Sequence, residues 1–120
     1  MNIEIIEHKG VPIALVSSQH IIISNEQNAL DLLANCGYQG ADAIIINEEN
    51  VSSDFFELST KLAGNVLQKF SNYRMQLAIV GSFDKYDSKS LRDFIYESNK
   101  GKRINFVSSI DEAKAALTNS

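Results

Sequence analysis

The sequence predicts an α/β fold with a single-layer mixed β-sheet, in which an antiparallel N-terminal hairpin is followed by parallel strands connected through helices. Two short β-branched runs flank Lys9–Gly10, which is a hairpin signature. Three further apolar runs of strand length then alternate with segments of helical periodicity. A flavodoxin-like sheet is the alternative, but its first strand leads directly into a helix, and the hairpin argues against it.

The strands are expected at the β-branched or continuously apolar runs of the chain. The hairpin strands are residues 2–7 and 11–17, so Pro12 should occupy an edge position or the first residue of its strand. The run 21–23 is either a third short strand or the approach to a helix. Continuous apolar runs indicate strands covered on both faces, and we expect right-handed crossovers that place helices over them. These later strands are residues 43–46, 77–80 and 104–107.

Four helices follow from capping residues and apolar periodicity. Ser24 with Gln27 forms a capping-box pair for the first helix, which Gly37 should end as a left-handed cap. Asp54 with Glu57 should begin the second helix, which continues to about residue 70. The last two helices are bounded by further capping signals: Ser88 or Ser90 at the start and Asn99 and Gly101 at the end of the third, and Ser109 with Glu112 at the start of the fourth, which runs to about Leu117.

The composition is that of one globular domain over residues 1–120. The apolar share of 44% and the charged share of 22% are ordinary for such a protein. No apolar run approaches the roughly 18 residues that a membrane span needs, and no secretory signal precedes the hairpin. The single cysteine excludes an internal disulfide and fits a reducing compartment. We therefore expect a cytoplasmic protein that does not bind a membrane.

The charge is unevenly distributed. The formal net charge is −4, yet residues 85–103 carry +3, so the rest of the chain sums to −7. The acidic total argues against nucleic acid as a partner. The basic segment could attract an anionic ligand or an acidic protein surface. Alternatively it is a solvated helix face, on which pairs such as Lys89 and Asp93 support the helix at i, i+4 spacing.

Motifs for metals, phosphate loops and nucleophilic catalysis are absent from the sequence. His8, His20 and Cys36 are far apart and have no second ligand at metal spacing, so neither a metal nor a cofactor is predicted. Cys36 occupies an apolar helix position, where it packs as a small hydrophobe. The chain contains neither G-x-G-x-x-G nor G-x-x-x-x-G-K-[ST]. No catalytic residue is predicted.

The best candidate for a site is the loop that follows strand 77–80. In open α/β sheets, ligands bind at the carboxyl ends of the strands, and here the strand stops at Gly81 and opens into a polar loop. The candidate ligand- or partner-binding residues are Ser82, Lys85, Ser88, Lys89, Ser90 and Arg92. The serines can equally be helix caps. Glu48, Asp84 and Asp87 also lie in strand-end loops, where they either bind a divalent cation or are simply solvated.

Three segments carry a family resemblance: ALDLLANCGYQGADAIII, LAGNVLQKFSNYRMQLAIVG and SKSLRDFIYESNKG. Through them the chain resembles a family of short bacterial proteins known only as a domain of unknown function, number four-one-eight-zero. The segments cover most of residues 28–101. The resemblance implies no activity and transfers no catalytic residue.

The order of elements also resembles the sulfate-transporter and anti-sigma-factor-antagonist module, a small regulatory fold. Such modules carry a phosphorylatable serine in a D-S-[ST]-G turn that begins the helix after the first buried strand. The region in that place here is 57–64, and the resemblance implies Ser59, beside Thr60, as a phosphorylation candidate. The glycine after the serine is missing, and the cap at Asp54 indicates a helix that begins earlier. The alternative is a packed or solvated pair of helix residues.

Two functions remain open from the sequence. The first is a small cytoplasmic regulatory or protein-binding module without catalytic activity, which forms a homodimer or binds another protein through the strand-end loops and helix 88–100. The second is a sensor of an anionic metabolite, or a small enzyme, with its site at the carboxyl ends of the parallel strands. There, Lys85 or Lys89 would hold the anion near Gly81.

Overall fold

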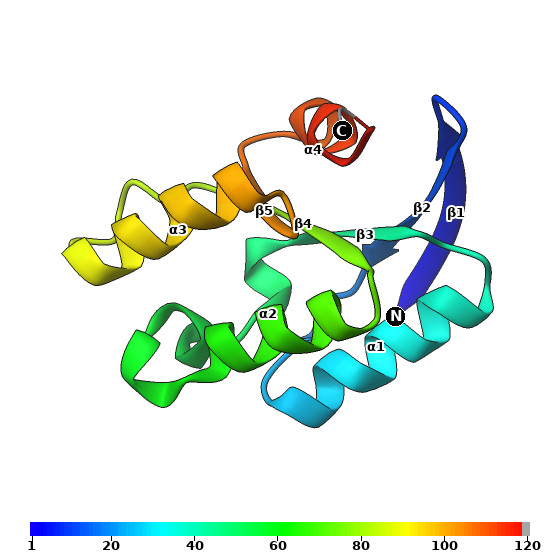
Figure 1. The fold of residues 1–120 in the computed structure, drawn as a ribbon. Coiled ribbons are helices and arrows are strands. Elements are labelled where there is room, and N and C mark those ends of the chain that lie inside the picture. Colours follow the sequence, from blue (N-terminus) through cyan, green and yellow to red (C-terminus); the bar gives the residue numbers. More distant parts are fainter. Residues whose placement is uncertain (119–120) are drawn as a thin grey trace.

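A computed structural model describes residues 1–118 and confirms the predicted α/β class with one five-stranded mixed sheet (Figure 1). The strands are β1 (Asn2–His8), β2 (Val11–Ser17), β3 (Ala43–Asn47), β4 (Gln76–Val80) and β5 (Ile104–Val107). The α-helices are α1 (Glu26–Tyr38), α2 (Leu62–Asn72), α3 (Lys89–Gly101) and α4 (Ile110–Thr118). Three short 3-10 helices, η1 (Glu48–Asn50), η2 (Ser53–Phe56) and η3 (Leu58–Thr60), lie between β3 and α2.

The strands lie in the sheet in the order of the sequence, β1-β2-β3-β4-β5. β1 and β2 form the predicted antiparallel hairpin, and both turn residues have the positive φ of a tight turn, 51° at Lys9 and 81° at Gly10. The other neighbouring pairs are parallel. Pro12 is the second residue of β2, an inner strand, so its predicted place was wrong. It is tolerated because the parallel register with β3 begins only at Ile13.

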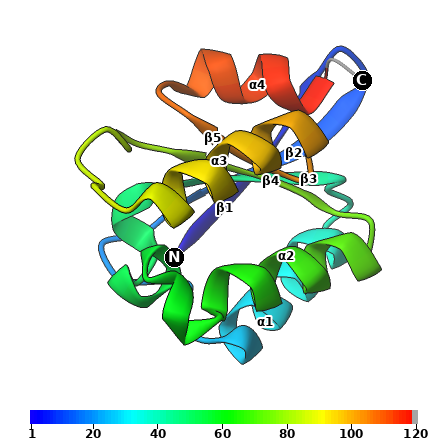
Figure 2. The same cartoon turned by 60° about the vertical axis from the view of Figure 1, so that its left-hand side comes forward.

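Helices cover the two faces of the sheet unequally. α1 and α2 lie side by side against one face, α4 lies on the opposite face, and α3 runs along β5 (Figures 1 and 2). The larger core cluster lies on the α1 and α2 face and includes Ile44, Phe55 and Phe70. A smaller cluster packs Ile13 and Ile45 under α4. None of the helices in residues 1–118 has the length and apolar character needed to cross a membrane.

The predicted N-cap of the first helix was wrong by one residue, and the predicted glycine at its end was wrong by three. The N-cap of α1 is Asn25, whose side chain accepts the Asn28 N–H, whereas Ser24 donates its hydroxyl to the Asn28 side chain. Gly37 lies inside the helix. The positive φ that follows it, 97°, belongs to Gly40. The run 21–23 is not a strand; it contributes one isolated parallel bridge, between Ile23 and Val51.

The second helix begins later than predicted. Asp54 lies in η2, and α2 starts only at Leu62, after Lys61 in the left-handed conformation with φ 68°. The Thr60 hydroxyl donates to the carbonyls of Asp54 and Glu57, at 2.6 and 2.8 Å, and so takes up acceptors that an α-helix would use. The last two helices begin as predicted, with Ser88 capping Leu91 and Ser109 capping Glu112.

Candidate functional site

Two neighbouring strand ends create the candidate site. β3 and β4 pair in parallel, with Asn47 opposite Val80 as the last pair. The residues that follow, Glu48 on one strand and Gly81 on the other, therefore leave the sheet side by side. Glu48 begins η1, while Gly81 begins the loop 81–88 that leads to α3.

The carboxylate of Glu48 binds this loop at three points. Its Oε2 accepts the Tyr86 hydroxyl at 2.6 Å and lies 2.7 Å from the Lys85 ammonium. Its Oε1 accepts the backbone N–H of Ser82 at 3.1 Å. The Glu48 side chain is only 14% exposed, so these charge-assisted contacts are partly shielded from water. One acidic side chain therefore holds the loop against the end of β3.

These contacts, hereafter the Glu48 network (Glu48, Ser82, Lys85 and Tyr86), favour an ionised Glu48 and a protonated Tyr86. Burial by itself disfavours the charged form of Glu48, but the hydrogen bonds from Lys85, Tyr86 and Ser82 outweigh it and lower the pKa of the carboxyl. Burial and the adjacent carboxylate both raise the pKa of the Tyr86 phenol. Tyr86 is thus a hydrogen-bond donor that cannot readily lose its proton, which suits a structural contact better than proton transfer.

Gly81 allows Glu48 to approach this closely. A Cβ added at Gly81 would lie 2.5 Å from both Cβ and Oε1 of Glu48. We expect Gly81→Ala to displace the Glu48 side chain and to lower the free energy of unfolding by about 1–3 kcal/mol, as overpacking typically does. Denaturant unfolding measures the loss. Gly64→Ala is the control, since a Cβ there meets no atom within 4 Å; equal stability of the two variants would contradict the close approach.

Aromatic side chains pack the same loop against the hydrophobic core. The Tyr86 ring stacks on Phe56 with centroids 4.9 Å apart, and Phe83 packs edge-on against Phe106 of β5 at 5.2 Å. Phe55, fully buried, contacts both Phe56 and Phe106. The loop is therefore packed onto the core as well as hydrogen-bonded to Glu48.

An open pocket of about 540 Å³ lies beside the network. The Phe56–Tyr86 pair lines it together with polar residues that follow the two strand ends. These polar residues include Asn47, Glu48, Glu49, Ser53, Ser82 and Lys85. Its walls combine one cation with two carboxylates. Lys85 already contacts Glu48, so a bound anion would have to compete with that carboxylate.

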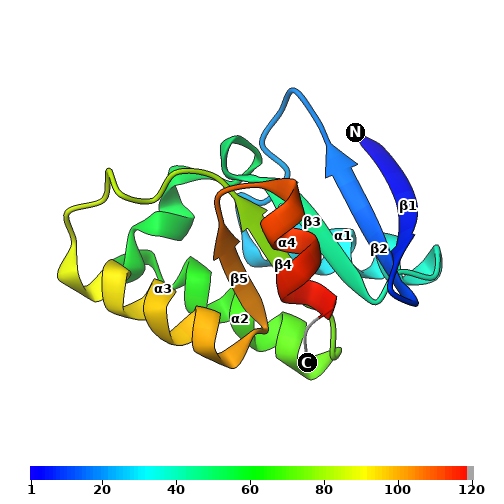
Figure 3. The same ribbon diagram turned by 90° about the horizontal axis from the view of Figure 1, so that it is seen from above.

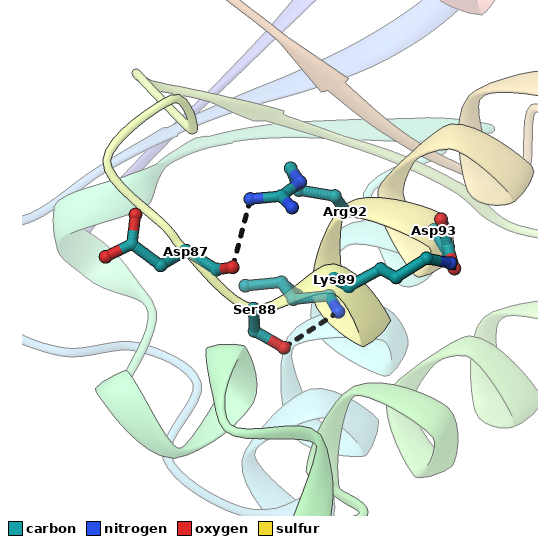
Figure 4. Close-up of polar contacts among 6 residues, drawn as sticks. Asp87, Ser88, Lys89, Arg92 and Asp93 are labelled. Atoms are coloured by element: carbon teal, nitrogen blue, oxygen red, sulfur yellow. Dashed lines mark hydrogen bonds and ion pairs between the residues drawn. The ribbon is translucent and has the colours of Figure 1, made fainter.

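The predicted binding residues lie along the loop and the first turn of α3, and most already have partners within the chain. Figure 4 shows three of them, Ser88, Lys89 and Arg92. Ser82 contributes its backbone N–H to Glu48, and the Ser88 hydroxyl caps the Leu91 N–H at 3.2 Å. Arg92 donates to the Asp87 carbonyl at 3.0 Å, as the dashed line in Figure 4 shows. Lys89 pairs with Asp93 at 2.9 Å on the exposed side of the helix, where Ser90 is also exposed.

The acidic residues proposed as cation ligands do not form a ligand cluster. Within residues 1–118, no group of three His, Cys, Asp or Glu side chains is placed to hold a metal ion. Glu48 is engaged with Lys85 instead. Cys36 is fully buried in α1, and burial raises the pKa of its thiol to about 11, as expected for a packed, unreactive cysteine.

Ser59 lies outside the helix in which it was expected. It is an exposed residue of η3, three positions before α2 begins at Leu62. The prediction of an α-helix that begins before Ser59 was thus wrong, because η2 and η3 replace the first turns of that helix. Phosphorylation of Ser59 stays a prediction.

Sequence reasoning did not reveal the contacts of two residues that organise this region. Tyr86 supplies the hydroxyl that Glu48 accepts, although 38 positions separate them. Asn50, 1% exposed, donates to the carbonyls of Ser18 and His20 and so ties the loop after β2 to the turn after β3. The available signal was that both residues lie in segments that follow strand ends, and such a position does not reveal the partner.

The comparisons with known proteins identify a family but no activity. Neither the curated proteins nor the solved structures include one that matches the chain. The resemblance to the anti-sigma-factor-antagonist module thus stays a prediction from the order of the elements. A family model described as a domain of unknown function, DUF4180, matches residues 8–117, which include the hairpin turn, all four helices up to Leu117 and the Glu48 network. The chain therefore belongs to the DUF4180 family.

Proposed function

We propose that this protein is a small cytoplasmic regulatory module that binds an acidic surface of another protein through α3. The supporting observation is a row of exposed side chains at i, i+3, i+4, i+7 and i+11 spacing, hereafter the α3 stripe: Lys89, Arg92, Asp93, Tyr96 and Lys100. This spacing places all five on one side of the helix. Tyr96 is 64% exposed, and the Lys100 ammonium lies 5.2 Å from its ring centroid.

The chemistry of the α3 stripe is that of a binding surface. Tyrosine and arginine are the residues that most often dominate the binding energy of protein interfaces. Charges of both signs discriminate between partners and steer association. Residues 85–103 carry a net charge of +3, which favours an acidic partner.

The Glu48 network supports this proposal by fixing the start of α3. Glu48 holds the loop through Ser82, Lys85 and Tyr86, and Arg92 then joins the loop to the first turn of the helix through the Asp87 carbonyl. A surface that is already ordered before binding loses less conformational entropy when it binds. In this proposal, the polar groups of the site position a recognition helix.

A variant of the α3 stripe tests the proposal. Lys89→Glu with Tyr96→Ala should reduce recovery of the stoichiometric partner from the native host by at least about tenfold, since loss of one interface hot spot typically exceeds 1.4 kcal/mol. The melting temperature should change little, because both side chains are exposed. Quantitative affinity purification followed by mass spectrometry measures the recovery. Arg92 is left intact because it also holds the loop.

The matched control is Tyr38→Ala, which removes a tyrosine that is 94% exposed on α1. This variant should recover the same partner as the unmodified protein. Equal recovery by the α3 variant and the control would contradict binding through the α3 stripe.

The alternative function is a sensor or enzyme for an anionic metabolite, and the pocket beside Glu48 is the observation that favours it. Lys85 is 58% exposed there, and an anion could displace it from Glu48. Glu48 and Glu49 would repel that anion, and we therefore rank this function second. Thermal stabilisation by a phosphorylated or carboxylated metabolite, lost in Lys85→Ala, would reverse the ranking.

A further inference from the structure

The two edges of the sheet differ in how their backbone groups are satisfied. At the β5 edge, the side-chain amide of Asn99 donates to the Phe106 carbonyl at 3.3 Å and accepts the Phe106 N–H at 2.7 Å. Asn99 thereby imitates a neighbouring strand. α3 packs along the same edge. This edge is closed to a further strand.

The β1 edge is open by comparison. β1 is the outermost strand, and all seven of its residues pair with β2 without a bulge, from Asn2 opposite Ser17 to His8 opposite Val11. In an antiparallel ladder, alternate residues direct their N–H and C=O groups away from the partner strand. β1 contains neither Pro nor Lys, which commonly protect edge strands. It is therefore long, regular and suited to pairing with another strand.

We propose that β1 pairs antiparallel with β1 of a second copy of this chain, so that the two sheets join across a two-fold axis. The side chains of β1 support a second copy as the occupant. Glu4, Ile6 and His8 share the α4 face of the sheet, since they lie opposite Leu15, Ile13 and Val11 of the smaller core cluster. A two-fold axis normal to the sheet keeps each residue on its own face, so this row meets an identical row.

Charge selects one register among the possible pairings. With the axis at Glu4 or at Glu7, like charges would lie directly opposite each other, which is destabilising. With the axis at Ile5, both glutamates would lie opposite isoleucines of the second copy. With the axis at Ile6, Glu4 of each copy lies opposite His8 of the other and Ile6 lies opposite Ile6. Among these four registers, only the last pairs the carboxylate of Glu4 with a hydrogen-bond donor.

The same pairing buries apolar surface that the helices leave uncovered. Figure 3 shows α4 lying over β3, β4 and β5, while β1 and β2 have no helix above them on that side. Ile6, Val11 and Leu15 are only half-buried there. Ile5, on the other face, is 38% exposed. A second copy extends this apolar strip across the axis and covers part of it.

The first test compares two isoleucines of nearly equal exposure by sedimentation equilibrium of the full chain. The unmodified protein should be a dimer. In the proposed register Ile5 lies opposite Glu7 of the second copy, so Ile5→Glu places like charges directly opposite each other and should raise the dissociation constant of the dimer at least about tenfold. Ile110→Glu alters an isoleucine of α4 that is 39% exposed and should leave the dimer unchanged. A monomeric unmodified protein, or equal dimerisation by both variants, would overturn the proposal.

The second test reads the register and does not require dissociation. The axis at Ile6 brings the two copies of that residue opposite each other, at the roughly 4.5–5.5 Å Cα spacing of paired strands that a disulfide can bridge. Ile6→Cys should therefore cross-link under mild oxidation, and Glu4→Cys should not, because its two copies lie four residues apart along the strands. Cross-linking of Glu4→Cys alone or of neither variant would reject this register. Cys36 is fully buried and can remain in place.

The inference does not rest on the proposed function, and the two can fail separately. The β1 interface lies at one edge of the sheet and α3 at the other. Loss of the dimer in Ile5→Glu is therefore independent of partner recovery by the α3 stripe. If both hold, the dimer presents two α3 stripes and can bind two sites at once.

Discussion

Replacing Phe55 with alanine should lower the free energy of unfolding by about 3–5 kcal/mol, the usual range for a buried phenylalanine. Phe55 is fully buried, and its ring lies between Phe56, at 5.1 Å, and Phe106, at 6.2 Å. Small domains are stable by only about 5–15 kcal/mol, so the loss is a large fraction of the total. Chemical denaturation at equilibrium measures it.

The Phe55→Ala cavity should also loosen the loop 81–88. Phe56 carries the stacked Tyr86 ring, and Phe106 carries Phe83. We expect the substitution to increase the rate of hydrogen exchange more in this loop than in β2, which lies away from the cavity. Tyr73→Ala is the control, since Tyr73 is 62% exposed and its loss should change stability by no more than about 0.5 kcal/mol. A Phe55 variant as stable as this control would show that the aromatic cluster does not support the loop.

Glu48→Gln should have the second largest effect, a loss of about 1–3 kcal/mol in the free energy of unfolding, as for hydrogen bonds to a charged group. Glutamine keeps the size of the side chain and one acceptor oxygen, but it removes the charge that Lys85 and the Tyr86 hydroxyl contact. The amide of Ser82 should exchange faster with solvent once its acceptor is weakened. Denaturant unfolding and hydrogen exchange measure the two effects.

The effect of Glu48→Gln should depend on pH in a defined direction. The pKa of Glu48 is lowered in the folded protein from its ordinary value of 4.5. As the pH falls below 4.5, the unfolded chain binds a proton at this position before the folded chain does, so the contribution of Glu48 to stability is progressively lost. Above that pH the contribution is complete. The stability difference between the unmodified protein and Glu48→Gln should therefore shrink in acid.

Glu49→Gln is the matched control for this experiment. Glu49 is the next residue of η1 and is exposed, and the same chemical change there should leave both the stability and its pH dependence nearly unaltered. A stability difference for Glu48→Gln that grew in acid would contradict a lowered pKa. A difference no larger than that of Glu49→Gln would contradict the role of Glu48 in holding the loop.

The sequence by itself determined the parts of the fold that depend on neighbouring residues. Lys9–Gly10 specifies the hairpin because a glycine beside two β-branched runs supplies the tight turn locally. The continuous run 43–46 specifies a buried strand because it leaves no polar face for solvent. Ser88 and Ser109 cap helices through amides only three residues away. Such signals are complete within a few positions of the chain.

The tertiary structure alone decided the start of α2 and the role of Glu48. Asp54 and Glu57 are a sound local cap, yet the burial of Phe55 in the aromatic cluster and the bonds of Thr60 replace the first helical turns with η2 and η3. From the sequence, Glu48 is one of three strand-end loop acids that either bind a cation or are solvated. Only the parallel pairing of β3 with β4 brings it to Gly81 and Tyr86, because contacts between distant segments depend on how the strands pack and not on their local composition.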